Sequence, residues 1–145
     1  MSELQNTVDW FKQAIPEPTD KQKCIQIGCH FEEVGEMLES IGDGGQYLIE
    51  DIAISYKSSY ECDVNNLASM DNFDKERLLD SLVDQIVTAT GVAHMMGFDL
   101  LDALAEVNRS NFSKFEDGKP VFNAHGKITK GKDYTPPNLS GMIGK

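Results

Sequence analysis

The sequence predicts an all-α fold, a bundle of four to five helices followed by an extended C-terminal arm. Apolar residues recur at spacings of three and four through most of residues 1–108, and this period is typical of amphipathic helices. From residue 109 onward the chain becomes basic and rich in glycine and proline. The length of 145 residues is usual for one domain. We therefore expect a single domain over residues 1–145, with a helical body of residues 1–108 and a basic arm of residues 109–145.

The ends of the first two helices are marked by proline and by capping residues. We expect the first helix over residues 2–14, because the two prolines that follow it prevent its continuation. Thr19 or Asp20 can cap a second helix that runs to about Ser40. The apolar positions of this second helix are Ile27, Phe31, Val34, Leu38 and Ile41.

A glycine-rich turn at residues 42–45 separates the second helix from a third, which is expected from Gln46 to about Cys62. One face of the third helix is expected to carry Leu48, Ile52 and Tyr56. Residues 63–73 are polar and are predicted to form a loop.

The fourth predicted helix is long and runs from Asp74 to Met96. The residues expected to face a core are Leu78, Leu79, Leu82, Val83, Ile86, Val87 and Ala93. Gly97 ends this helix, and Asp99 can cap a fifth helix through Asn108. In the arm, Val121-Phe122 and Lys127-Ile128 flank a polar turn and predict a small β-hairpin.

Charge is divided unevenly along the chain, whose net charge is −11. Residues 1–106 hold 6 Lys/Arg and 21 Asp/Glu, whereas residues 107–145 hold 7 and 3. This balance argues against a protein whose main task is to bind a nucleic-acid backbone. An acidic body with a basic arm suggests that the body binds cations and that the arm meets an anion.

Cysteine usage and hydropathy favour a cytoplasmic protein with no membrane partner. Three cysteines without a C-x-x-C pair indicate neither a disulfide framework nor a zinc ribbon. The first residues lack the basic and apolar regions of a signal peptide. The most apolar stretch, residues 86–98, is about half as long as a membrane span.

Two pairs of carboxylates lie on the predicted helices. Glu33 and Glu36 are three residues apart, so they share one helix face. Asp80 and Asp84 are one turn apart on the fourth helix. Like charges at these spacings repel, and a divalent cation such as Mg²⁺, which prefers carboxylate oxygens, removes the repulsion. Exposed, solvated acidic faces are the alternative interpretation of each pair.

Several segments together resemble the MazG-like all-α nucleoside triphosphate pyrophosphohydrolases, a superfamily that includes phosphoribosyl-ATP pyrophosphohydrolase and the dimeric dUTPases. These segments are Glu32-Glu33-x-x-Glu36, the later helix Leu82-Val83-Asp84-Gln85-Ile86-Val87, and Gly97-Phe98-Asp99. Residues 106–114 and 126–137 are similar to the tail of phage-type members. The resemblance covers about residues 20–139.

The resemblance implies hydrolysis of an NTP or dNTP to a nucleoside monophosphate and pyrophosphate, with Mg²⁺ as cofactor and Mn²⁺ as a possible substitute. It implies that Glu33, Glu36 and Asp84 hold the cation and that Glu32 or Glu33 orients the attacking water. The candidate substrate-binding residues are Asn111, Lys114, Lys127, Lys130 and Tyr134. The resemblance also implies a homodimer or a homotetramer.

Two features depart from the superfamily pattern. Ser81 stands where the second motif, E-x-x-D, has its glutamate, and Asp80 is the candidate to replace that carboxylate in the metal site. The longer gap between Glu36 and Asp84 implies an inserted or extended third helix around residues 46–70, in which Glu50 and Asp51 are either extra ligands or, as we rather expect, exposed charges. Two alternative functions stay open: a catalytically silent helical oligomer with a regulatory role, and a phosphoribosyl-ATP pyrophosphohydrolase.

Overall fold

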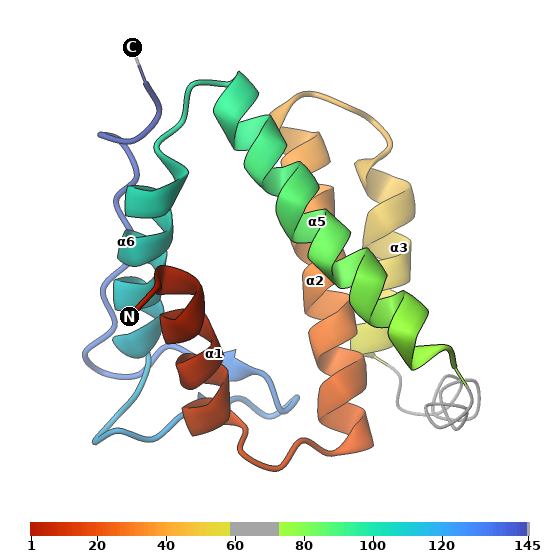
Figure 1. Ribbon diagram of the computed structural model, residues 1–145. Helices are drawn as coiled ribbons and strands as arrows, with labels where there is room; N and C mark the ends of the chain where they lie inside the picture. Colours follow the sequence, from red (N-terminus) through yellow and green to blue (C-terminus); the bar gives the residue numbers. More distant parts are fainter. Residues whose placement is uncertain (59–72, 145) are drawn as a thin grey trace. The chain divides into compact units, whose positions relative to one another are not determined.

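The computed structural model describes residues 1–58 and 73–144 (Figure 1). In these residues the chain is mostly helical, with five α-helices and one small antiparallel hairpin near the C-terminus, as the sequence predicts. The chain divides into two compact units, and each is described by itself. One unit comprises Met1–Pro16 and Asp74–Lys145, and the other comprises Glu17–Phe73.

The unit Glu17–Phe73 is a helical hairpin of α2 (Asp20–Ser40) and α3 (Gln46–Lys57). Thr19 caps α2 in a capping box: its hydroxyl accepts from the backbone N–H of Gln22, and the Gln22 side chain accepts from the backbone N–H of Thr19. Gly42 follows α2 with a φ of +74°, which glycine adopts without strain. Helix α3 ends at Lys57, with Ser58 as its C-cap, earlier than the predicted end at about Cys62. Of the loop predicted at residues 63–73, all but Phe73 lies outside the described residues.

The buried face of α2 differs from the predicted one. The buried residues are Cys24, Ile25, Gly28 and Gly35, whereas Ile41 is 64% exposed. On α3, Ala53 is buried, whereas the predicted Leu48 is 72% exposed. The predicted faces are correct only in part: Phe31 and Tyr56 meet across the two helices, and the two glycines, which add nothing to a hydrophobic pattern, were missed.

Gly28 allows α2 and α3 to approach closely. A Cβ atom at this position would lie 2.5 Å from the Cγ of Lys57 and 2.8 Å from the carbonyl oxygen of Ala53. One ring pair, Phe31 and Tyr56, stacks across the same two helices with centroids 5.9 Å apart. This close packing fixes α2, which carries the predicted acidic motif.

The second unit contains α1 (Glu3–Ala14), α5 (Lys75–Met95) and α6 (Leu100–Phe112), each with a side-chain N-cap. The caps are Ser2, Asp74 and Asp99. The core of this unit is formed by Trp10, Ala14 and Phe115. Its aromatic rings stack in parallel, with the centroids of Trp10 and Phe115 5.5 Å apart.

Helix α6 extends beyond the predicted end at Asn108 and includes Arg109 and Asn111. No proline or glycine interrupts the chain before Gly118. An ion pair from Arg109 to Glu106, with the nitrogen and oxygen 2.7 Å apart, also supports the last turn of the helix. The arm therefore leaves the helix only after Phe112.

The hairpin in the arm pairs β1 (Val121–Phe122) with β2 (Ile128–Thr129) in antiparallel register. The second strand starts one residue later than predicted, because Lys127 belongs to the turn. The carbonyl oxygen of Lys127 accepts from the N–H of Asn123, and the Asn123 carboxamide oxygen accepts from the N–H of Lys127. These two bonds close the loop between the strands.

The predicted core face of α5 is largely exposed in this single chain. Ala93 is buried as predicted, whereas the other predicted core residues, Leu78, Leu79, Leu82, Val83, Ile86 and Val87, are 41% to 63% exposed. The described part of this unit therefore leaves most of the apolar side chains of α5 accessible. None of the described helices is long and apolar enough to cross a bilayer.

Candidate metal and nucleotide site

The acidic motif on α2 consists of three carboxylates in different environments. Glu33 and Glu36 are exposed, while Glu32 is partly buried. An oxygen of Glu32 lies 2.7 Å from the Nζ of Lys57, and the side chains are 33% and 26% exposed. The motif therefore includes a lysine from α3 that sequence reasoning missed. Twenty-five residues separate Lys57 from Glu32, so only the folded hairpin reveals the contact.

Helix α3 also brings Glu50 close to α2. A Cβ atom at Gly35 would lie 3.7 Å from the Cγ of Glu50, which is an ordinary van der Waals distance. Asp51 is exposed, as the sequence predicts. The α2–α3 hairpin thus carries most of the candidate acidic side chains on a rigid pair of helices.

The second acidic pair lies on α5, in the other unit. Asp80, Ser81 and Asp84 are all exposed there. The backbone carbonyl of Asp84 accepts from the hydroxyl of Thr88 at 2.9 Å, a bond that does not involve the carboxylate. Among the described residues, no group of three or more His, Cys, Asp or Glu side chains is gathered as a metal site. The two predicted carboxylate pairs therefore lie in different units.

Two predicted substrate-binding residues, Asn111 and Lys114, form a pair at the end of α6. The Nζ of Lys114 donates to the carboxamide oxygen of Asn111 at 2.8 Å. The same Nζ lies 6.0 Å from the centroid of the Trp10 ring, which belongs to the core of this unit. Lys114 is therefore held at the surface of a packed aromatic core.

The arm returns to this pair through Gly131. The N–H of Gly131 donates to the carbonyl oxygen of Lys114 at 3.1 Å, and a Cβ atom at Gly131 would lie 2.6 Å from that oxygen. Two more predicted residues flank the contact, with the Nζ of Lys130 4.9 Å from the centroid of the Tyr134 ring. The structure thus brings the 130–134 segment beside Lys114. Lys127 stands apart from this contact, in the hairpin turn.

A polar latch, Glu106–Arg109, fastens the arm to α6. Two guanidinium nitrogens of Arg109 bond the carboxylate of Glu106 at 2.7 and 2.8 Å. Arg109 also donates to the hydroxyl of Thr135 and to the carbonyl of Pro136, while Glu106 accepts from the N–H of Asn138. The hydrogen bonds from Arg109 and Asn138 lower the pKa of Glu106 to about 2. An i,i+3 Glu–Arg spacing was the only sequence signal for this latch.

The neighbouring residues of α6 tie down α1 and the arm. Asn108 is 4% exposed; its amide donates to the backbone carbonyl and the carboxylate of Glu3, and its oxygen accepts from the hydroxyl of Thr7. The hydrogen bond from Asn108 is the main cause that lowers the pKa of Glu3. Ser110 is 2% exposed and donates to the carbonyl of Thr135. The basic arm is therefore an integral part of its unit.

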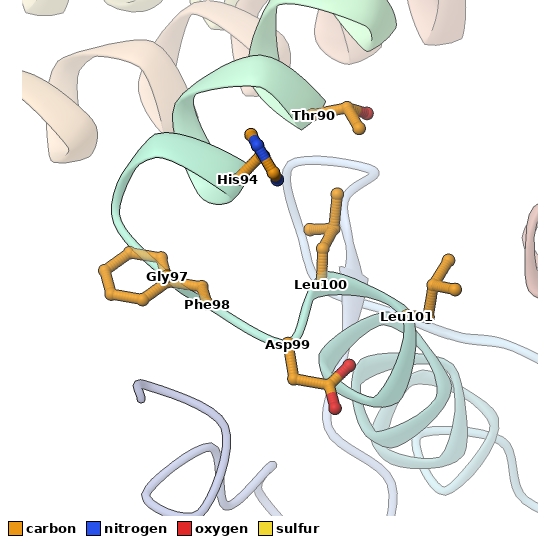
Figure 2. A pocket seen from close by; sticks show the side chains of 7 residues that line it. All are labelled: Thr90, His94, Gly97, Phe98, Asp99, Leu100 and Leu101. Carbon is orange, nitrogen blue, oxygen red and sulfur yellow. The ribbon is translucent and has the colours of Figure 1, made fainter. Parts of the chain in front are cut away.

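A shallow depression lies at the turn between α5 and α6 (Figure 2). Its volume is about 550 Å³, and the lining residues are Thr90, His94, Gly97, Phe98, Asp99, Leu100 and Leu101. The two oxygen-bearing side chains have local roles, because Thr90 donates to the carbonyl of Ile86 and Asp99 caps α6. None of the predicted site residues lines it.

No family model, curated protein or solved structure matches this chain. The chemistry of the candidate site is therefore inferred from its side chains. Exposed carboxylates such as Glu33 and Glu36 supply the hard oxygen donors that Mg²⁺ prefers. Lys114 and Lys130 supply ammonium groups that can bond phosphate oxygens. The carboxylates lie in one unit and these lysines in the other.

Proposed function

We propose that this chain is a Mg²⁺-dependent nucleoside triphosphate pyrophosphohydrolase of the MazG-like type. It would hydrolyse an NTP or dNTP to a nucleoside monophosphate and pyrophosphate. The observation that carries the proposal is the acidic motif on α2, because its exposed carboxylates Glu33 and Glu36 stand on a helix fixed by close packing against α3. The hydrogen bond from Lys114 to Asn111 also supports the proposal, because it fixes an ammonium group that can bind phosphate.

In this proposal the carboxylates have separate roles. Glu33, Glu36 and Asp84 hold Mg²⁺ or Mn²⁺, and Asp80 contributes the carboxylate that Ser81 lacks. The donor set fits the cation, because all these groups are carboxylates on the exposed sides of their helices. The cation, when bound, neutralises phosphate oxygens and makes the bound water more acidic. Glu33, or Glu32 beside it, accepts a hydrogen bond from the attacking water and orients it.

The arm is proposed to bind the phosphates. Lys114 and Lys130 would contact oxygens that the cation leaves bare, and Asn111 would donate to a neighbouring oxygen. Lys127 at the hairpin turn and Tyr134 beside Lys130 complete the proposed substrate-binding set. The support for this assignment is that the arm folds back on α6 and fixes the Lys114 backbone through Gly131.

The proposal includes a homodimer or a homotetramer. Its support is the exposed apolar surface of α5, where Leu79 is 63% and Val87 62% exposed. Burying such side chains is worth roughly 25 cal/mol for each Å² removed from water. The second candidate function, a catalytically silent helical oligomer, is favoured by the same surface and by Ser81.

The test is pyrophosphate release from a panel of NTPs, dNTPs and phosphoribosyl-ATP with Mg²⁺. We expect Glu33→Gln and Glu36→Gln to lower kcat/KM at least 100-fold, because each substitution removes a cation ligand without changing the side-chain volume. Glu39→Gln is the matched control, since it removes an exposed carboxylate of the same helix outside the motif. Turnover in both variants close to that of Glu39→Gln would contradict the proposed site.

The same assay separates the remaining roles. Asp84→Asn should behave like Glu36→Gln, and Asp80→Asn should lower activity more than Ser81→Ala does if Asp80 replaces the missing glutamate.

Lys114→Met should lower kcat/KM about tenfold, because it removes an ammonium group proposed to bind phosphate. Lys119→Met, at an exposed lysine of the arm, is the control. A silent oligomer would release no pyrophosphate and would show no tight Mn²⁺ binding by calorimetry.

A further inference from the structure

The ion pair between Lys57 and Glu32 lies inside the acidic motif and has no part in the function proposed above. The Nζ of Lys57 is 2.7 Å from the carboxylate of Glu32, and about a quarter to a third of each side chain is exposed. Most exposed ion pairs are mobile and contribute little. This pair is more constrained, because the stem of the lysine is packed against the neighbouring helix.

The Lys57 side chain packs against Gly28, where the absence of a side chain leaves room for it. A Cβ atom at Gly28 would lie 2.5 Å from the Cγ of Lys57, so any other residue there would push the lysine away. Gly28 precedes Glu32 by four residues, so Gly28 and the Glu32 carboxylate lie on the same side of α2, one turn apart. The packing of the stem therefore directs the ammonium group toward Glu32.

We infer that Lys57 is a positioning residue that serves as a built-in counter-cation of the acidic motif and tunes its affinity for a divalent cation. This inference rests on the proposed function. Glu32, Glu33 and Glu36 together carry three negative charges, and Lys57 lowers the net charge of this motif to −2. Lys57 holds Glu32 out of the coordination sphere, so that the more exposed Glu33 and Glu36 bind the cation.

The experiment compares Mn²⁺ affinity, measured by calorimetry on the full chain, among matched variants. Lys57→Met keeps the packed stem and removes the charge, and we expect Mn²⁺ to bind about fivefold more tightly, because a positive charge near the cation is lost. Lys57→Arg should keep the wild-type affinity within about twofold. Lys23→Met is the control: Lys23 lies 2.8 Å from Asp20 on the same helix, about 13 Å along the axis from Glu32.

Two further variants test the assignment of Glu32. Glu32→Gln removes one negative charge near the cation and should weaken Mn²⁺ binding by no more than about fivefold, whereas Glu36→Gln also removes a ligand and should weaken it more than about 50-fold. Equal affinities of Lys57→Met and Lys23→Met, or equal losses in Glu32→Gln and Glu36→Gln, would overturn the role of Lys57 while leaving the proposed function standing. No Mn²⁺ binding by any variant, wild type included, would overturn the proposed function and this inference with it. Helical circular dichroism confirms that each variant is folded.

Discussion

Each of the two units of the chain is stabilised internally, and the kind of interaction differs between them. In the hairpin of α2 and α3, the helices approach closely because Gly28 and Gly35 leave room for the side chains and backbone of α3. In the other unit, polar side chains of α6, above all Asn108 and Arg109, bind α1 and the arm around an aromatic core. The hairpin thus depends on the absence of side chains at two glycines, which permits close helix packing. The other unit depends on hydrogen bonds made by polar side chains.

This difference matters for the proposed chemistry. The hairpin presents an acidic motif on a helix with a buried small-residue face, so its carboxylates are carried by a rigid support. The other unit presents its lysines at the surface of a packed aromatic core, on an arm fixed by hydrogen bonds. Substitutions that disturb the close packing of α2 and α3, or the hydrogen bonds of α6, but not both, test this difference directly.

The largest effect is expected at Asn108. Asn108→Ala removes three hydrogen bonds at a buried position and leaves the hydroxyl of Thr7 and the carbonyl of Glu3 without this partner. We expect a loss of about 2–3 kcal/mol in the free energy of unfolding, measured by urea denaturation. Asn111→Ala is the control: its carboxamide oxygen accepts from the partly buried Lys114, and loss of that bond should cost less than about 1 kcal/mol. Equal losses in the two variants would contradict the role of the buried Asn108 in joining α6 to α1.

A smaller effect, on the other unit, is expected at Gly28. Gly28→Ala places a methyl group 2.5 Å from Lys57 and 2.8 Å from the carbonyl of Ala53, and should cost about 1–3 kcal/mol. Gly35→Ala is a matched control seven residues along the same helix, where the new methyl group would meet its nearest neighbours at 3.7 Å. We expect that variant to keep or gain stability, because alanine favours a helix by up to about 1 kcal/mol over glycine. Thermal melts that rank the two variants in the opposite order would show that α2 and α3 do not approach closely at Gly28.

The smallest effect is expected when Glu106 is protonated at low pH. The pKa of Glu106 is lowered from 4.5 to about 2, so its ion pair with Arg109 stabilises attachment of the arm above about pH 4.5. That contribution is lost as the pH falls from 4.5 through 2. We expect the backbone amide signals of Thr135 and Asn138 to broaden or shift over this range in NMR spectra. Glu106→Gln should remove this pH dependence, and an unchanged pH response in that variant would assign the transition to other carboxylates.

The local features of the fold could be predicted from the sequence. Helix starts at Ser2, Thr19, Asp74 and Asp99 follow from short polar side chains that accept from the first turn, and helix ends follow from glycine at residues 42 and 97. The antiparallel hairpin was predicted to within one residue, because short apolar segments flank a polar turn.

The contacts between distant residues could not be predicted. The face of α2 that meets α3 is marked by glycines, which carry no hydrophobic signal, and the pair Lys57–Glu32 joins positions on different helices. The buried role of Asn108 was missed because asparagine is usually exposed. In the candidate site, the sequence singled out Asn111 and Lys114 separately, and the structure adds their hydrogen bond.

The most direct test of the proposed function is ³¹P NMR of a mixture of NTPs and dNTPs incubated with the full chain and Mg²⁺. The proposal predicts that at least one nucleotide is converted to its monophosphate with an equal amount of pyrophosphate, and that the conversion stops in Glu36→Gln but continues in Glu39→Gln. Formation of a nucleoside diphosphate and orthophosphate, or an unchanged mixture with folded protein, would contradict it.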